Sequence, residues 1–258
     1  MELEACASAA IASGYEQLFA LGGDGTFQHL VAAALGSEVT VGLLPAGGGN
    51  DVARALRMPR DPIAAARELL QGNVRAMDVL RARFSDGHAR IYVGGGGSGL
   101  DAESALLAAG PFRRLPGAVR YVSAALWSLL SYRPLDAEVT LDGQTIPQSD
   151  RLLIAAVSNT PTYGAGVRIA PNARPDDGLL DLVLVREMPL VRLIEAIPAI
   201  LRDGAIGWPE IRRFQGRRAS IRSATPAAFH GDGELLGTTP VEIEVLPQAI
   251  RVITPNRS

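Results

Sequence analysis

The chain has 258 residues, of which 47% are hydrophobic, and a formal net charge of −2 at pH 7. A chain of this size buries enough apolar surface for one large or two modest domains, and its near-neutral charge argues against a dedicated nucleic-acid-binding protein. All 25 basic residues are arginine. This excludes P-loop proteins, protein kinases and Schiff-base enzymes, because each of these classes needs a lysine at its site.

The single cysteine, Cys6, excludes an internal disulfide, and the three histidines are too scattered to form a structural zinc site. No segment reaches the roughly 18 uninterrupted apolar residues that span a bilayer. The N-terminus lacks the basic start and long apolar run of a signal peptide. We therefore expect a cytoplasmic protein.

Residues 1–76 alternate between strand-like and helical segments, and a glycine loop follows each of two strands. After Thr26 the apolar residues recur with the i, i+3, i+4 spacing of one helical face, and Asn50 and Asp51 are favourable at a helix start. The pattern predicts, in chain order, a helix over 5–13, a strand over 18–21, a glycine turn over 22–25, a helix from 26, a strand over 39–44, a loop over 45–49 and helices over 52–56 and 63–70. This order is typical of an α/β domain with a parallel sheet.

After Gly72 the pattern changes to short alternating segments separated by turns, which indicates a mainly β region. The expected elements are strands over 77–84, 89–93, 137–141, 152–157, 179–185, 219–221 and 241–245, and helices over 118–132 and 190–202. We place the domain boundary near residue 76, so that residues 1–76 form the α/β domain and residues 77–258 the β domain.

The two consecutive strand, loop and helix units indicate a binding site for phosphate. They place two sets of backbone N–H groups and two helix N-termini at the same edge of a sheet, where polyanions bind. Because lysine is absent, the charge of a triphosphate has to be met by backbone dipoles, arginine and a divalent metal, and the metal needs carboxylates. The candidates are Asp24, Asp177, Asp232 and Glu234.

Two of the acidic segments are weak signals when they are taken alone. Asp177 belongs to an Asp-Asp-Gly turn before an apolar strand, and Asp232 and Glu234 belong to a Gly-Asp-Gly-Glu segment. Asp-Gly pairs are common in ordinary hairpin turns, so each segment alone is more typical of a turn than of a metal site.

Taken together, four motifs resemble the diacylglycerol kinase catalytic domain family, in particular its small bacterial lipid kinases, to which the sphingosine kinases are related. They are GGDGT at 22–26, PAGGGNDVARAL at 45–56, YGAGVRIAPNARPDDGLLDLVLV at 163–185 and GDGE at 231–234. NAD kinases and phosphofructokinases share GGDGT, but the four motifs in this order, over nearly the whole chain, are specific to the family.

The resemblance implies an N-terminal nucleotide-binding domain, a C-terminal β-sandwich and an active site in the cleft between them. It implies that ATP binds to Gly22, Gly23, Asp24, Gly25, Thr26, Phe27 and Gln28 and to the loop residues Gly47, Gly48, Gly49, Asn50 and Asp51. It places Mg²⁺ at the side chain of Asp177 with the backbone of Arg174 and Leu179. Glu234 falls at the family's proton acceptor, and Asp24 and Asp232 are further catalytic candidates.

The chain departs from the family's pattern at three places. Gln28 and His29 stand where the family commonly has Asn-Glu, and Gly48 replaces a threonine in the second loop. Only 21 residues precede Gly22, so we expect the family's first strand and its loop to be missing from this chain.

Several other features have competing interpretations. Residues 94–99 match G-x-G-x-x-G, but no acid follows about twenty residues later, so close backbone packing is favoured over a dinucleotide site. The helix over 118–132 packs in the core or forms a lipid-facing wall. The five arginines of residues 211–223 lie on a solvated surface or attract an anionic membrane. His230 is interpreted as a structural neighbour of the Gly-Asp-Gly-Glu turn.

The sequence thus predicts an ATP- and Mg²⁺-dependent lipid kinase, with diacylglycerol as the nominal substrate and phosphatidic acid as the product. The alternatives are a catalytically weak regulatory protein that binds a nucleotide or lipid, and a kinase of a soluble substrate such as NAD. The expected partner is a lipid, with no nucleic acid. Peripheral contact with the inner membrane face and a homodimer are left open.

Overall fold

The computed structural model describes residues 2–111, 127–128, 134–147, 151–164 and 166–256. Its first part is an α/β module in which the predicted order of strands, glycine loops and helices is confirmed. The module contains α1 (Glu2–Ala12), β1 (Gln17–Gly22), α2 (Asp24–Ala34), β2 (Thr40–Pro45), α3 (Asp51–Ala55) and α4 (Pro62–Leu69).

The sheet of this module is parallel. β1 pairs in parallel with β2, and β2 pairs in parallel with the C-terminal end of β14 (Val241–Thr254). The apolar face of α2, which includes Phe27 and Val31, is buried in the core of the module. Because parallel strands end at the same sheet edge, the loops that follow β1 and β2 lie next to each other.

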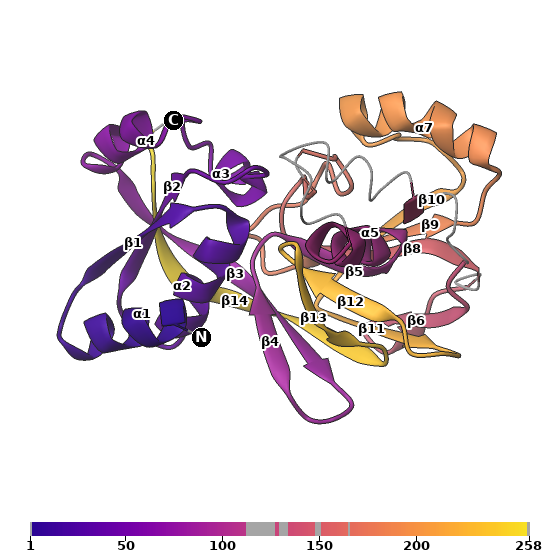
Figure 1. The fold of residues 1–258 in the computed structure, drawn as a ribbon, viewed down its shortest axis with the longest axis horizontal. Helices are drawn as coiled ribbons and strands as arrows, with labels where there is room; N and C mark the ends of the chain where they lie inside the picture. Colours follow the sequence, from indigo (N-terminus) through magenta and orange to yellow (C-terminus); the bar gives the residue numbers. More distant parts are fainter. Residues whose placement is uncertain (1, 112–126, 129–133, 148–150, 165, 257–258) are drawn as a thin grey trace.

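Two long strands connect the α/β module to the rest of the chain. β3 (Asn73–Phe84) and β14 form an antiparallel ribbon that runs from one module into the other (Figure 1). Along β3, Val79 belongs to the core of the first module and Leu80 to the core of the second. β14 makes the same transition before Ile250, so its C-terminal end packs in the first core. The predicted boundary at residue 76 placed this C-terminal end in the β domain, whereas Ile250, Val252 and Ile253 pack in the core of the α/β module.

The second module is a β-sandwich of two facing sheets. One sheet has the order β10-β9-β8-β5-β12-β13, and the other is built on β3 and β14 with β4, β11, β6 and β7. The elements are β4 (Ala89–Tyr92), β5 (Gly95–Gly99), α5 (Leu100–Ala109), β6 (Ala137–Leu141), β7 (Gln144–Thr145), β8 (Leu152–Ser158), β9 (Leu180–Arg186), α7 (Leu190–Asp203), β10 (Ile211–Gly216), β11 (Arg218–Ser223), β12 (Ala228–Gly231) and β13 (Glu234–Thr238). Tyr92 and Ile243 of one sheet pack with Leu182 and Phe229 of the other in a single core.

The predicted fold class, an α/β module followed by a mainly β sandwich, is confirmed. The predicted helix over 118–132 lies outside the described residues except for residues 127 and 128. Within the described ranges, none of the helices combines the length and apolar character needed to cross a bilayer.

Candidate active site between the two modules

The two glycine loops touch each other at the edge of the parallel sheet. The N–H of Ala46 donates to the carbonyl oxygen of Gly22 at 2.8 Å. A Cβ atom on Gly47 would lie 2.4 Å from the Cα of Gly23, and one on Gly22 would lie 2.4 Å from Oγ1 of Thr26. A side chain at Gly47 would therefore force the two loops apart, and one at Gly22 would displace Thr26 in the first turn of α2, which explains the two glycines.

Asp24 fastens the two loops together. It is the first residue of α2, and its carboxylate accepts the N–H groups of Asp51 (3.0 Å) and Val52 (2.9 Å) at the start of α3. Burial raises the pKa of Asp24 above its usual value, and the two backbone hydrogen bonds oppose that rise. Both oxygens of Asp24 thus hold α3 beside α2.

The second loop presents backbone donors that the protein does not use. Asn50 has a left-handed φ of 54°, and its side chain accepts the N–H of Gly47 (3.0 Å) and donates to the Gly47 carbonyl (2.8 Å). Within the described residues, the N–H groups of Gly48, Gly49 and Asn50 donate to no protein acceptor. Such donors next to the N-terminus of α2 suit the oxygens of a phosphate chain.

Asp232 fastens a turn of the sandwich in the way that Asp24 fastens the glycine loops, by accepting backbone N–H groups. Its Oδ2 accepts the N–H of Val93 (2.7 Å) and its Oδ1 accepts the N–H of Gly94 (2.8 Å), which binds the turn between β12 and β13 to the end of β4. Burial raises the pKa of Asp232 to about 7, and the negative charge of Asp24 adds to the rise. Asp24 and Asp232 therefore lie close enough to interact across the module boundary.

Glu234, the first residue of β13, extends from the sandwich to the α/β module. Its Oε1 lies 3.5 Å from Nε2 of His29. A Cβ atom placed on Gly25, in the first turn of α2, would lie 3.2 Å from the same oxygen. The side chain is 46% exposed, and its carboxylate accepts no hydrogen bond among the described residues. Unlike Asp24 and Asp232, Glu234 therefore accepts no backbone N–H within the described residues, and its carboxylate can take up a proton from a substrate.

The predicted metal turn is joined to these three acids by no hydrogen bond or ion pair among the described residues. Oδ1 of Asp177 accepts the N–H of Leu179 at 3.0 Å, and no contact joins Asp177 to Asp24 or Glu234 in the described part of the chain. Asp78, buried in β3, holds the turn by accepting the N–H groups of Gly178 and Gln248, each at 2.7 Å. The sequence analysis missed Asp78, although an acid inside the apolar segment 77–80 was a usable signal.

Mg²⁺ prefers carboxylate, carbonyl and water oxygens and keeps several waters. One carboxylate from Asp177 and carbonyl groups at Arg174 and Leu179 fit that preference, whereas no cluster of three or more acidic, histidine or cysteine side chains suited to a metal occurs in the described part of the chain. The nearby Asp181 has a pKa raised to about 6, mainly by burial, and the charge of Asp177 contributes to the rise.

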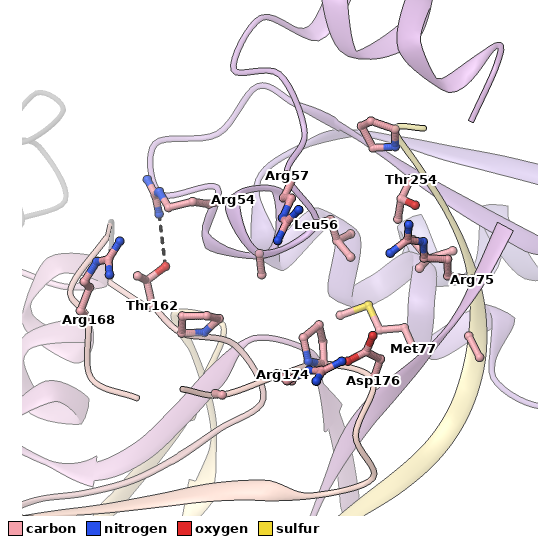
Figure 2. Close-up of a pocket in the computed structure, with 17 residues that line it drawn as sticks. Arg54, Leu56, Arg57, Arg75, Met77, Thr162, Arg168, Arg174, Asp176 and Thr254 are labelled. Atoms are coloured by element: carbon pink, nitrogen blue, oxygen red, sulfur yellow. Dashed lines mark hydrogen bonds and ion pairs between the residues drawn. The ribbon is translucent and has the colours of Figure 1, made fainter. Parts of the chain in front are cut away.

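An arginine-lined cavity of about 650 Å³ lies between the modules beside α3 (Figure 2). Arg54, at its edge, forms an ion pair with Asp51 and lies 3.4 Å from the hydroxyl of Thr162, which joins α3 to the sandwich. The charged side chains that line it are Arg54, Arg57, Arg75, Arg168, Arg174 and Asp176. This excess of positive charge attracts anions to the boundary without any lysine.

A buried polar group that the sequence analysis did not assign lies under the turn that carries Asp232. Oδ2 of Asp101 is 3.0 Å from Nε2 of His230 and accepts the hydroxyl of Tyr163 at 2.8 Å. Burial raises the pKa of Asp101, but the charge and hydrogen bond of His230 and the Tyr163 bond outweigh it, so the pKa lies below its usual value. His230 thus pairs with Asp101, and its interpretation as a structural neighbour of the turn stays a prediction.

Comparisons with known proteins agree with this architecture. Residues 2–82 match the model of the diacylglycerol kinase catalytic domain, and residues 94–254 match that of the YegS C-terminal NAD kinase beta sandwich-like domain. A diacylglycerol kinase of Mycobacterium tuberculosis (strain ATCC 25618 / H37Rv) is 30% identical over 250 residues, which cover 96% of this chain and 80% of the relative. One of Bacillus subtilis (strain 168) is 28% identical over 248 residues, covering 93% and 78%.

The fold is also found in a crystal structure of a putative diacylglycerol kinase from Bacillus anthracis str. Sterne. It superposes with a TM-score of 0.80 at 23% identity and covers 99% of this chain and 83% of the other. With both modules matched in order and a 30% identical relative aligned over nearly the whole chain, the resemblance of the four motifs is confirmed. The chain belongs to the diacylglycerol kinase catalytic domain family and is a kinase.

Proposed function

We propose that the protein transfers the γ-phosphoryl group of ATP to a lipid hydroxyl, with diacylglycerol as the acceptor and phosphatidic acid as the product. The observation that carries the proposal is the position of Glu234. Its carboxylate comes from the sandwich and lies against Gly25, beside the two glycine loops of the other module. A free carboxylate next to unused N–H donors is the arrangement that phosphoryl transfer to a hydroxyl requires.

The phosphates of ATP bind to the glycine loops. The N–H groups of Gly48, Gly49 and Asn50 and the N-terminus of α2 donate to the phosphate oxygens, and the close contact of Gly23 with Gly47 keeps both loops in place. The arginines of the cavity add positive charge in the place of the missing lysine.

Glu234 accepts the proton of the lipid hydroxyl while the hydroxyl oxygen attacks the γ-phosphorus. Asp24 and Asp232 are less suited to this task, since both oxygens of each carboxylate accept backbone N–H groups. We assign them positioning roles: Asp24 aligns the loops, and Asp232 holds the turn that delivers Glu234. Asp177, with the backbone of Arg174 and Leu179, would hold Mg²⁺, which supplies charge neutralisation when bound.

A lipid substrate requires contact with a bilayer, and we propose that α7 makes it. Leu190, Val191 and Ile194 of this helix are exposed, and Val191 has 69% of its surface in solvent. At least two of the five arginines of residues 211–223 are engaged within the protein. Arg213 donates to the carbonyls of Ile169 and Gly204, and Arg218 pairs with Glu244, so both are used inside the protein.

The test is transfer of label from [γ-³²P]ATP to an acceptor in the presence of Mg²⁺. Vesicles that contain diacylglycerol, extracted bacterial lipids, NAD and sugars are offered separately to the same enzyme. We expect labelled phosphatidic acid from the diacylglycerol vesicles. Label in NAD or a sugar alone assigns a soluble substrate, and nucleotide binding without transfer to any acceptor assigns a regulatory protein; either result overturns the proposal.

A further inference from the structure

His29 is the residue of α2 that lies next to Glu234. It stands four residues after Gly25, so the two positions share one face of the helix. Glu234 lies over that face, and its Oε1 is 3.5 Å from Nε2 of His29. The position is one of the three at which the sequence departs from the family's motif, so the contact is a feature of this chain's own residues.

Both ring nitrogens of His29 face carboxylates. Nδ1 lies 2.8 Å from Oε1 of Glu4 in α1, on the side opposite Glu234. The three side chains come from α1, α2 and β13, and Glu4 and Glu234 are the charged groups that contact His29 within the described residues. The imidazole is 23% exposed, and the Glu4 carboxylate is 40% exposed. Glu234, His29 and Glu4 therefore form a continuous series of contacts that begins at the module boundary and ends at the solvent-exposed carboxylate of Glu4.

A neutral imidazole carries one proton, and the hydrogen bond at one nitrogen fixes which nitrogen has it. Donation from Nδ1–H to Glu4 leaves the lone pair of Nε2 directed at Glu234. Glu4 then stabilises the imidazolium that forms when Nε2 takes a proton, as a carboxylate behind a histidine does at other sites.

We propose that His29 is a positioning residue that acts through Glu234: its Nε2 accepts a hydrogen bond from the carboxylic acid that Glu234 becomes in each turnover and then removes that proton. The inference rests on the proposed role of Glu234. The O–H bond of the acceptor breaks as its oxygen bonds to the γ-phosphorus, the bond from that phosphorus to ADP breaks, and the proton passes to Glu234. The proton then moves from Glu234 to Nε2 of His29, which returns Glu234 to its carboxylate form. The imidazolium finally releases the proton to water.

The kinetic test compares His29→Ala and His29→Gln with a matched control. His88 also pairs with a carboxylate, Asp86, but in the hairpin between β3 and β4, so His88→Gln is the control. We expect His29→Ala to lower kcat by about tenfold, less than the 10² to 10⁴ of a direct general base, with the KM for ATP unchanged. Added imidazole restores much of the loss. His29→Gln, which keeps a hydrogen-bond acceptor but cannot carry the proton, retains more activity than His29→Ala and does not respond to imidazole.

A second readout does not depend on activity. The chain has three histidines, so their imidazole NMR signals can be assigned with single variants. Because both carboxylates contact the His29 ring, Glu234→Gln and Glu4→Gln should each change the ring chemical shifts of His29 and leave those of His88 unchanged. If neither variant changes the His29 ring signals, or if His29→Ala keeps the wild-type kcat while Glu234→Gln is inactive, the inference is overturned. An inactive wild-type enzyme with the NMR shifts intact overturns the proposed function instead.

Discussion

Because the two glycine loops touch at Gly23 and Gly47, we expect alanine to destabilise the protein at Gly47 but not at the neighbouring Gly48. A Cβ atom on Gly47 would lie 2.4 Å from the Cα of Gly23 and 2.9 Å from both the Gly23 nitrogen and Oδ1 of Asn50. A Cβ on Gly48, one residue later, would meet nothing within 4 Å. Neither glycine has a left-handed φ, so the two positions differ in space rather than in backbone strain.

Gly47→Ala should therefore lower the free energy of unfolding by about 1–3 kcal/mol, the usual cost of forcing an extra carbon into a packed site. For a protein of this size each kcal/mol shifts Tm by roughly 2–4 °C, which gives a fall of about 2–12 °C. Gly48→Ala should change Tm by about 2 °C or less, because it adds a carbon to open space.

The assay is thermal unfolding of both variants by circular dichroism at one pH, followed by the KM for ATP. Because Gly47→Ala pushes the loops apart, it should also raise that KM, whereas Gly48→Ala should not. Equal Tm values for the two variants would refute the reasoning that the loops are in contact. A large loss of stability in Gly48→Ala alone would place the close approach at the wrong residue.

Four further predictions concern Gly48, Asp24, Asp232 and Val191. Gly48→Thr should lower the KM for ATP about 2- to 13-fold, which corresponds to the roughly 0.5–1.5 kcal/mol of one hydrogen bond. The open space at Gly48 admits the side chain, and Gly48→Ala, which adds no hydroxyl, should leave the KM unchanged. Asp24→Asn should reduce both Tm and activity, because an amide offers one acceptor where the carboxylate accepts two N–H groups. Burial raises the pKa of Asp232 to about 7, well above that of an aspartate exposed in the unfolded chain. The folded state therefore keeps a proton that the unfolded state loses, and stability falls as the pH rises through this window. Urea unfolding at pH 5 and pH 7 should show a smaller fall in Asp232→Asn than in the wild type. Val191→Glu in α7 should weaken co-sedimentation with anionic vesicles and leave Tm unchanged, and unaltered co-sedimentation would exclude α7 as the membrane contact.

Local pattern was sufficient for the α/β module. The helix from Thr26 and the strands around it carry their periodicity within ten residues, and both glycine loops are marked by composition. The strand β5 was missed because residues 95–99 are glycine and serine and show no alternation. Their close packing was expected, and the structure gives its reason: a Cβ on Gly96 would lie 2.2 Å from the carbonyl oxygen of His230.

The long strand β14 shows what a local pattern cannot supply. The predicted strand over 241–245 ends where Pro247 and Gln248 interrupt the alternation, yet the chain resumes and pairs with β2. Gln248 has a positive φ of 51° and donates its N–H to Asp78, some 170 residues earlier in the chain. A bulge held by so distant an acid depends on tertiary contacts and leaves no periodic signal.

The sequence predicted only part of the site, because it marks short motifs but not the distant residues that position them. Asp24, Asp232 and Glu234 lie in short motifs, and the structure brings them together from both modules. Asp177 was predicted to hold Mg²⁺, and the structure adds that its turn is held by Asp78 in β3. The motif defined the turn, and the partner that positions the turn lies elsewhere in the sequence. The roles of all four acids stay predictions until they are tested by substitution.

The kcat of Glu234→Gln, measured with ATP and diacylglycerol vesicles, bears on the whole proposal. Glu242→Gln, an exposed acid in β14, serves as the control. If Glu234 takes the hydroxyl proton, the variant should lose about 10²- to 10⁴-fold in kcat, with the KM for ATP and Tm unchanged, because the interaction is made in the transition state. A variant that keeps its kcat, or that raises only the KM for ATP, would contradict the assignment of Glu234 as the base.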